Sequence, residues 1–270
     1  MRGFILAAGL GTRLRPLTQL VPKPMVAVAD MPLVERAVRQ LAAAGVREIG
    51  VNVYHQPEPI LSHLGDGSRF GVSLRIFDER ISPAGAEGAG EVQREPLGTG
   101  GGLKAAEAWL REGGESFVLV NGDAWHSYDL GAVCAAHRSD AVATMVVHVD
   151  RRRPELHTLE CHPDGHMPRF LARVPMSVDE LEAHSPGFLG IYTGVAVFAT
   201  RLLDRLPKGR VSGLVLHGLQ PALQGGERID WLRPEGLWVD CGTVEELQRA
   251  DIFARSLRCL PLERALAGLA

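Results

Sequence analysis

The sequence predicts an α/β fold in which helices flank a mixed, mostly parallel sheet. Short apolar runs at residues 4–8 and 117–120 suit buried parallel strands. Between them, residues 32–44 carry apolar side chains at helical spacing, and residues 48–53 follow as the second strand of a βαβ unit. At 270 residues, 46% of them hydrophobic, the chain can build one large domain of this class.

The remaining elements are expected in this order along the chain. A short helix at 60–64 precedes a strand at 72–77, a surface loop at 80–91 and a helix at 103–110. A glycine cluster opens this last helix, whose N-terminal amide groups are expected to be free for a ligand. Strands are expected at 141–149 and 188–198, followed by a helix from Thr243 to residue 250 and a helical tail over 251–270.

Composition excludes several classes of protein. The net charge of −3 gives no overall positive field of the kind that nucleic-acid binders show. Four cysteines stand far apart without a Cys-x-x-Cys pair, which favours free thiols in a reducing compartment. The amino-terminal residues form a strand and not a signal peptide, and no apolar run approaches membrane-spanning length. We therefore expect a cytoplasmic protein without nucleic-acid or membrane partners, either a monomer or a small homo-oligomer.

A glycine-rich loop follows the first strand and suits an anionic ligand. Gly9 and Gly11 let the backbone turn and expose its N–H groups. Arg13 adds a guanidinium fork that fits phosphate oxygens, and Lys23 stands between two prolines that restrict its backbone. The segment predicts a triphosphate site with Arg13 and Lys23 as catalytic candidates.

Two other nucleotide-binding loops fit this segment poorly. A dinucleotide-binding loop needs Gly-x-Gly-x-x-Gly, but position 14 is Leu14, and the second strand ends with Asn52 and Tyr54 instead of an acid that would bind a ribose. A P-loop would need Gly-Lys-Ser/Thr, which is absent from this segment. A dinucleotide-dependent oxidoreductase therefore stays a weaker alternative.

Two carboxylates end predicted strands. Asp123 follows the apolar strand 117–120 and stands beside a glycine, and Asp240 ends a strand near residue 238. Carboxylates at strand ends, next to a phosphate site, suit a hard cation such as Mg²⁺. The alternative for Asp123 is a helix N-cap.

The string Gly-Leu-Gly-Thr-Arg-Leu-Arg-Pro-Leu-Thr at 9–18, with Pro-Lys-Pro at 22–24, resembles the signature of the sugar-1-phosphate nucleotidyltransferases, or nucleotide-sugar pyrophosphorylases. Leu-Gly-Thr-Gly at 97–100 and Trp-x-Asp-x-Gly-Thr at 238–243 extend the resemblance to about residue 250. It implies the Rossmann-like nucleotide-diphospho-sugar transferase fold as a single domain over 1–270. Its nucleotide-binding half is expected at 1–150, its sugar-phosphate half at 151–242 and a helical tail at 243–270, with no C-terminal β-helix because no hexapeptide repeat is present.

The resemblance implies that a nucleoside triphosphate and a sugar 1-phosphate condense to an NDP-sugar and pyrophosphate with Mg²⁺ as cofactor. It assigns nucleotide binding to Leu6, Ala7, Ala8, Gly9, Gly11, Thr12, Arg13, Gln93, Gly98 and Thr99, sugar-phosphate binding to Arg173, Tyr192, Thr193 and Gly194, and metal binding to Asp123 and Asp240. The amide of Gln93 can accept from and donate to the edge of a uracil or thymine.

Residues 124–130 are most similar to the N-acetylmuramate-1-phosphate uridylyltransferase branch of this family, which favours uridylyl transfer for the cell envelope. The string at 95–100 equally resembles mannose- and heptose-1-phosphate guanylyltransferases, so guanylyl transfer stays an alternative. Two departures concern sugar recognition: Arg173 stands where the family has a lysine preceded by an acid, and Tyr192 replaces an asparagine. A non-catalytic nucleotide-sugar sensor is the alternative of another class, although Lys23 and both aspartates are present.

Overall fold

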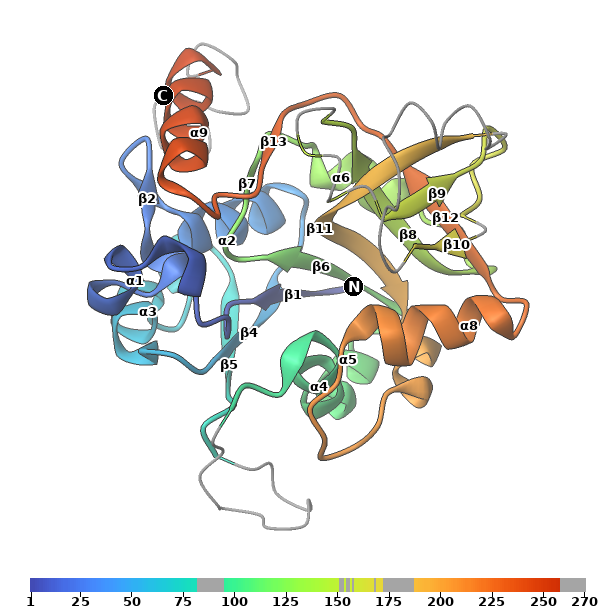
Figure 1. Ribbon diagram of the computed structural model, residues 1–270. Helices are drawn as coiled ribbons and strands as arrows, with labels where there is room; N and C mark the ends of the chain where they lie inside the picture. Colours follow the sequence, from blue (N-terminus) through green and yellow to red (C-terminus); the bar gives the residue numbers. More distant parts are fainter. Residues whose placement is uncertain are drawn as a thin grey trace.

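The computed structural model describes residues 1–81, 95–150, 153, 156, 158–167, 169–171 and 187–257. Within these ranges a central sheet separates two apolar cores, and helices cover both of its faces (Figure 1). The predicted α/β class with a mixed sheet is confirmed, whereas the proposed division at residues 150 and 242 stays a prediction. None of the described helices is long and apolar enough to cross a lipid bilayer.

The parallel part of the sheet sets the position of the site. Its strands run in the order β5 (Ser73–Asp78), β4 (Glu48–Val53), β1 (Arg2–Leu6) and β6 (Ser116–Asn121). In this register Leu6 pairs with Asn52 on one side and with Asn121 on the other. Because parallel strands end at one edge, the carboxyl ends of β4, β1 and β6 bring these three residues to the same level.

The second part of the sheet is largely antiparallel and begins at β11 (Phe188–Ala199). This strand pairs antiparallel with β6 and with β8 (Ala141–His148), and β12 (Arg228–Leu232) lies parallel to β8. The β11–β8 register shifts between Tyr192 and Ala196, beside the carboxyl end of β6. The short strands β9 (Leu159–Cys161) and β10 (Arg169–Phe170) form an antiparallel pair at the start of β11.

Alternation along the central strands builds the two cores, because successive side chains point to opposite faces. Phe4 packs on one face with helices α4 (Gly98–Ala105) and α5 (Glu107–Glu112). Ile5 packs on the other face with the second set of helices. That set comprises α2 (Leu33–Ala43), α3 (Pro57–Leu64) and α6 (Leu130–Ala135). Burying each large apolar side chain contributes about 1.5–3 kcal/mol, which favours the predicted helix over residues 32–44.

A third, smaller cluster brings the two predicted metal ligands together. Strands β7 (Trp125–His126) and β13 (Trp238–Val239) pair antiparallel outside the central sheet. Asp123 precedes β7 and Asp240 follows β13, so antiparallel pairing places both aspartates at the same end of the pair. Helix α9 (Val244–Ser256) covers this cluster beside the strand β2 (Ala27–Val28), as Figure 1 shows.

Two predicted helices have different bounds in the structure. The glycine cluster does not precede its helix but forms α4 from Gly98 onward. The helix is interrupted at Ala106, after which α5 begins. The predicted helix at 243–250 continues to Ser256 as α9, and residues 258–270 of the expected tail lie outside the described ranges, as does most of the predicted loop at 80–91.

Candidate functional site

The loop after β1 turns at Gly11, where φ is +62°. A Cβ at this position would lie 2.9 Å from Thr18 Cγ2, so only glycine fits the turn. The Thr18 hydroxyl donates to the Gly11 carbonyl over 2.8 Å and ties the turn to α1 (Leu17–Leu20). At Gly9, in contrast, an added Cβ would meet no atom within 4 Å. The loop therefore has a fixed turn at Gly11 and an open backbone at Gly9.

Lys23 connects three parts of the site. It begins a 3₁₀ turn directly after Pro22, and it is only 5% exposed. Its Nζ donates to Asp123 Oδ2 over 2.9 Å and to the main-chain carbonyl of Asp240 over 3.2 Å. One ammonium thus links the segments that follow β6 and β13. The alternative role for Asp123, as a helix N-cap, does not fit the structure, because Asp123 precedes strand β7 and its carboxylate pairs with Lys23.

Asp240 has positive partners of its own. Arg13 donates from its two terminal nitrogens to Asp240 Oδ2 at 2.8 Å and Oδ1 at 3.4 Å. Burial raises the pKa of this carboxyl, but hydrogen bonding to Arg13 and the positive charges of Lys23 and Arg153 lower it by more. The pKa of Asp240 is therefore below its ordinary value, and the side chain stays an anion at neutral pH.

Three cavities adjoin one another at Asp123, which lines all of them. The first, of about 210 Å³, lies between the ends of β1 and β4 and the start of α4. The second, of about 140 Å³, lies at the loop after β1, and the third, of about 240 Å³, lies between the ends of β6 and β13 and the middle of β11. The parallel sheet edge and the β7–β13 pair together create this junction.

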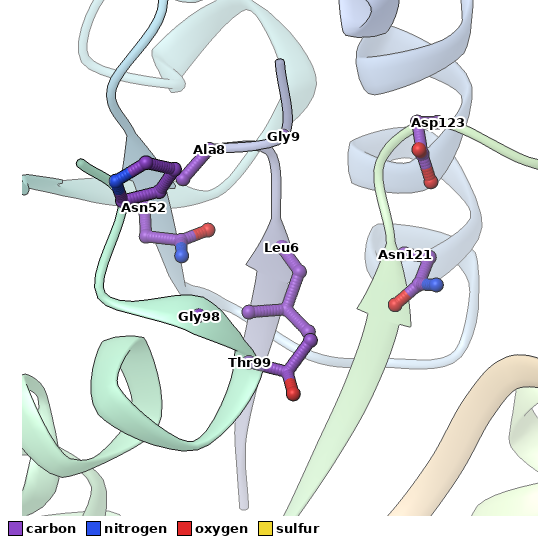
Figure 2. A pocket seen from close by; sticks show the side chains of 9 residues that line it. Leu6, Ala8, Gly9, Asn52, Gly98, Thr99, Asn121 and Asp123 are labelled. Atoms are coloured by element: carbon purple, nitrogen blue, oxygen red, sulfur yellow. The ribbon is translucent and has the colours of Figure 1, made fainter. Parts of the chain in front are cut away.

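The cavities contain most of the residues that the sequence analysis selected. Figure 2 shows Leu6, Ala8 and Gly9 from the end of β1 opposite Asn121 and Asp123 in the first cavity. The predicted residues that line each cavity are Leu6, Ala8, Gly9, Gly98 and Thr99 for the first, Gly11, Thr12, Arg13 and Lys23 for the second, and Tyr192, Thr193 and Asp240 for the third. Ala7 lies behind the wall of the first cavity and is 2% exposed.

A buried polar network joins two walls of the first cavity. Asn52 accepts from the Ala7 N–H over 2.8 Å and donates to Glu79 Oε1 over 2.7 Å. The other Glu79 oxygen accepts from the Leu97 N–H over 2.8 Å. Burial raises the pKa of Glu79, and the hydrogen bonds from Asn52 and Leu97 offset part of this effect. The network fixes the end of β1 relative to the start of α4. Glu79 was not among the predicted site residues, because no local sequence pattern marks it as buried.

Glu79→Gln is expected to lower the free energy of unfolding by about 1–3 kcal/mol, since its amide NH₂ would face one of the two N–H donors that the carboxylate satisfies. Urea denaturation at pH 7 measures the effect. Glu58→Gln is the matched control, because Glu58 pairs with Arg80 at the exposed surface and its loss should change the denaturation midpoint little. Equal midpoints for wild type and Glu79→Gln would contradict the role of the network.

Asn121 separates the first cavity from the third and lines both. Gly194, with φ at +80°, makes room for it, since a Cβ at Gly194 would lie 2.4 Å from Asn121 Cγ. Gly194 therefore acts through Asn121 and does not line the third cavity itself. Asn121 was not among the predicted site residues, although the string Asn121-Gly122-Asp123 ends an apolar strand.

The hydroxyl groups on the predicted sugar side have different environments. The Thr193 hydroxyl donates to the Val146 carbonyl over 2.9 Å, and Thr193 is 2% exposed. The Tyr192 hydroxyl is buried and has no hydrogen-bond partner within the described ranges, and burial raises its pKa. Tyr192 and Thr193 both line the third cavity, but the Tyr192 hydroxyl is shielded from solvent and the Thr193 hydroxyl is bound to the main chain.

The start of α4 differs from the expectation. We expected free amide groups for a ligand there, but the N–H groups of Gly100 and Gly101 donate to the Ser212 carbonyl at 2.8 and 3.3 Å. A Cβ on Gly98 would also lie 2.7 Å from that oxygen, so close packing of two chain segments explains these glycines. Gln93 and Arg173 lie outside the described residues, and their roles stay predictions.

Comparison with known proteins agrees with the geometry. Residues 2–157 match the family model described as nucleotidyl transferase. The N-acetylmuramate alpha-1-phosphate uridylyltransferase of Neisseria meningitidis serogroup B is 31% identical over 257 residues, which cover 94% of this chain and 98% of that protein. The mannose-1-phosphate guanyltransferase of Gibberella zeae is 30% identical over 249 residues, or 91% of this chain. This chain spans only 62% of the fungal protein.

A solved structure of a Bacillus anthracis protein, assigned as a glucose-1-phosphate thymidylyltransferase, aligns with a TM-score of 0.73. The alignment covers 94% of this chain and 95% of that one at 20% identity, which shows a shared fold. The family model covers more than half of the chain, and the Neisseria meningitidis relative aligns with it over almost the full length of both proteins. The chain therefore belongs to the nucleotidyl transferase family.

Proposed function

We propose that this protein transfers a nucleotidyl group from a nucleoside triphosphate to a sugar 1-phosphate and releases pyrophosphate. The observation that supports this most directly is the junction of three cavities at Asp123, with Lys23 bound to both aspartate segments. A reaction with two substrates and a leaving group needs three adjoining binding subsites. The Lys23 ammonium, at the junction of these subsites, can act on the reacting phosphate.

Each cavity suits one part of the substrates. The first is mostly apolar, with Leu6 and Ala8 in its wall, and it fits a nucleoside. The second combines the backbone of the Gly11 turn with Arg13 and Lys23, which fits the β- and γ-phosphates. The third lies beside both aspartates and the Tyr192 segment, and it fits the sugar phosphate.

In the proposed reaction, an oxygen of the sugar 1-phosphate attacks the α-phosphorus and forms a new P–O bond. The bond from that phosphorus to the oxygen bridging to the β-phosphate breaks, and pyrophosphate leaves with the electron pair. Lys23 stabilises the charge that develops on the α-phosphate oxygens, and Arg13 holds the leaving group. A general base is unnecessary, because the attacking phosphate is already an anion.

We propose Mg²⁺ as the cofactor, held by Asp123 and Asp240. The two side chains fit this ion, because their carboxylates line the same cavity and hard cations prefer oxygen ligands. The depressed pKa of Asp240 keeps that ligand ionised at neutral pH. When bound, the ion neutralises charge on the substrate phosphates.

A pyrophosphate-release screen tests the function. The purified protein is mixed with each of the four ribonucleoside triphosphates or dTTP, and with N-acetylmuramate, glucose, mannose or heptose 1-phosphate, in the presence of Mg²⁺. We expect release with at least one pair and none when the sugar phosphate is omitted. Absence of release from every pair, with the protein folded, would contradict the proposal and favour a non-catalytic sensor.

We further propose uridylyl transfer, so UTP or dTTP should give a higher kcat/KM than GTP. The Gln93 amide can accept from N3–H and donate to O4 of a pyrimidine, whereas guanine presents two donors that a carboxylate satisfies better. An unpaired buried donor costs about 1–3 kcal/mol, which sets a preference of roughly tenfold or more. Gln93→Glu should narrow or reverse this preference. Gln224→Glu should not, because Gln224 is exposed at the end of a helix and lines none of the three cavities. A wild-type preference for GTP would refute the assignment.

We also propose that the enzyme works in the cytoplasm as a monomer or small homo-oligomer. Within the described ranges Cys134, Cys161 and Cys241 are free, which suits a reducing compartment. Cell fractionation with size-exclusion chromatography and light scattering tests both points.

A further inference from the structure

Three side chains that can bind metal ions gather on the turn between β9 and β10. His162, Asp164 and His166 each offer one ligand atom, and these atoms lie within 4.8 Å of one another. The two imidazole rings are 4.9 Å apart between centroids, and Asp164 Oδ1 lies 2.5 Å from His166 Nδ1. None of the three residues lines the cavities at Asp123, so this cluster is separate from the proposed active site.

Backbone contacts hold the turn in this shape. Gly165, with φ at +89°, lets the turn close, and the N–H of Gly165 donates to the His162 carbonyl over 3.1 Å. Two hydrogen bonds from Trp231 on the neighbouring strand β12 also hold the turn. The Trp231 N–H donates to the Gly165 carbonyl over 3.0 Å, and the Trp231 indole N–H donates to the His162 carbonyl over 2.8 Å. The three side chains are therefore gathered on a backbone that needs no ligand to order it.

We propose that this turn binds a divalent transition-metal ion of the Zn²⁺ class through His162, Asp164 and His166. Two imidazoles with one carboxylate favour such an ion over Mg²⁺ or Ca²⁺, which prefer oxygen ligands alone. Three protein ligands leave the fourth tetrahedral position for water. Tetrahedral Zn²⁺ with bonds of ~2.0–2.1 Å separates its ligand atoms by about 3.4 Å. Ligand atoms that lie up to 4.8 Å apart must therefore approach one another, whereas Asp164 Oδ1 and His166 Nδ1, which are 2.5 Å apart, must separate if both bind the ion.

A neighbouring carboxylate supports the same assignment. Glu160 Oε1 lies 3.6 Å from His162 Nε2, and Arg169 Nε donates to the other Glu160 oxygen over 2.8 Å. A carboxylate beside one imidazole nitrogen favours the proton on that nitrogen and leaves the other for a metal ion. Because the folded turn is held in place by β12, an ion that binds only this folded form would stabilise the folded chain.

Zinc binding to tag-free protein tests this proposal. Equilibrium dialysis against ZnCl₂, with millimolar Mg²⁺ present to compete for Asp123 and Asp240, should give one Zn²⁺ per chain. Zn²⁺ should also raise Tm, and Co²⁺ in its place should give the visible absorption of a tetrahedral site. His162→Ala and His166→Ala should each lower the Zn²⁺ affinity at least tenfold. His217→Ala, a histidine on another segment, is the matched control and should bind as wild type does.

The exposed Asp164 provides a further variant where a histidine substitution prevents folding, and Asp164→Ala should also weaken binding at least tenfold. Zn²⁺ binding that survives all three substitutions overturns the proposal. So does binding that is lost in Asp123→Asn but kept in His166→Ala, because that result places the ion in the active site. These measurements do not require turnover, so failure of the proposed nucleotidyl transfer would leave the zinc assignment intact.

Discussion

Lys23→Ala is expected to lower kcat/KM about a hundredfold or more while the protein stays folded. The ammonium is buried, and it is fixed by two contacts, one to the Asp123 carboxylate and one to the Asp240 carbonyl. It therefore meets the reacting phosphate with little side-chain freedom left to lose. Losing a preorganised charge from a phosphoryl transition state costs on the order of 3 kcal/mol, which corresponds to roughly a hundredfold in rate. Steady-state pyrophosphate release measures the loss.

Lys104→Ala is the matched control for this variant. Lys104 also pairs with a carboxylate, that of Glu107, and donates to a main-chain carbonyl, that of Leu203, but it lines none of the three cavities. Its loss should change thermal stability without a comparable loss of activity. Circular dichroism checks that both variants fold. Lys23→Ala that retains more than about a third of the wild-type kcat/KM would exclude a catalytic role for Lys23.

Removal of divalent cations with excess EDTA is expected to abolish activity, and added Mg²⁺ should restore it. Asp123→Asn and Asp240→Asn should each lower kcat/KM by about a hundredfold or more, because an amide oxygen is a weaker ligand than a carboxylate for a hard cation. Both carboxylates line one cavity, so they are expected to hold the ion together. The double variant should then lose little more activity than either single variant.

A Mg²⁺ titration separates this role from a general loss of structure. Asp123→Asn and Asp240→Asn should each need a higher Mg²⁺ concentration for half-maximal activity than the wild type does. Asp251→Asn is the control, because Asp251 pairs with Arg255 much as Asp240 pairs with Arg13, but it stands on α9 and lines none of the three cavities. Its Mg²⁺ requirement should equal that of the wild type. Full activity in excess EDTA would refute the metal assignment.

The sequence was sufficient to select residues that a short local pattern marks, and the structure brings these residues together. The Gly11 turn, Lys23 and the two aspartates each stand directly after an apolar strand or between prolines, and the structure places them around one junction. The central strands were likewise visible as apolar runs, and β4 has the predicted bounds.

Other features depend on contacts between distant segments and leave no local mark. Glu79 supports the first cavity through Asn52 and Leu97, and its burial is a property of the assembled fold. Glycine in α4 was ambiguous, since close approach to a ligand and close approach to Ser212 impose the same absence of a side chain. The antiparallel direction of β11 is equally invisible, because alternation of side chains is the same in both directions.

In each of the ion pairs Lys23–Asp123 and Arg13–Asp240, a carboxylate that would bind a metal ion is paired with a positive group that would bind a phosphate. A metal ion bound to the two carboxylates would free the Lys23 and Arg13 side chains to bind phosphates. Phosphates bound to these two side chains would in turn free the carboxylates to bind the metal ion. Such partner exchange would produce positive heterotropic cooperativity between the proposed metal ion and the nucleotide. By thermodynamic reciprocity, the metal tightens nucleotide binding by the same factor by which the nucleotide tightens metal binding. We therefore expect the proposed site to favour a magnesium–nucleotide complex over either component alone.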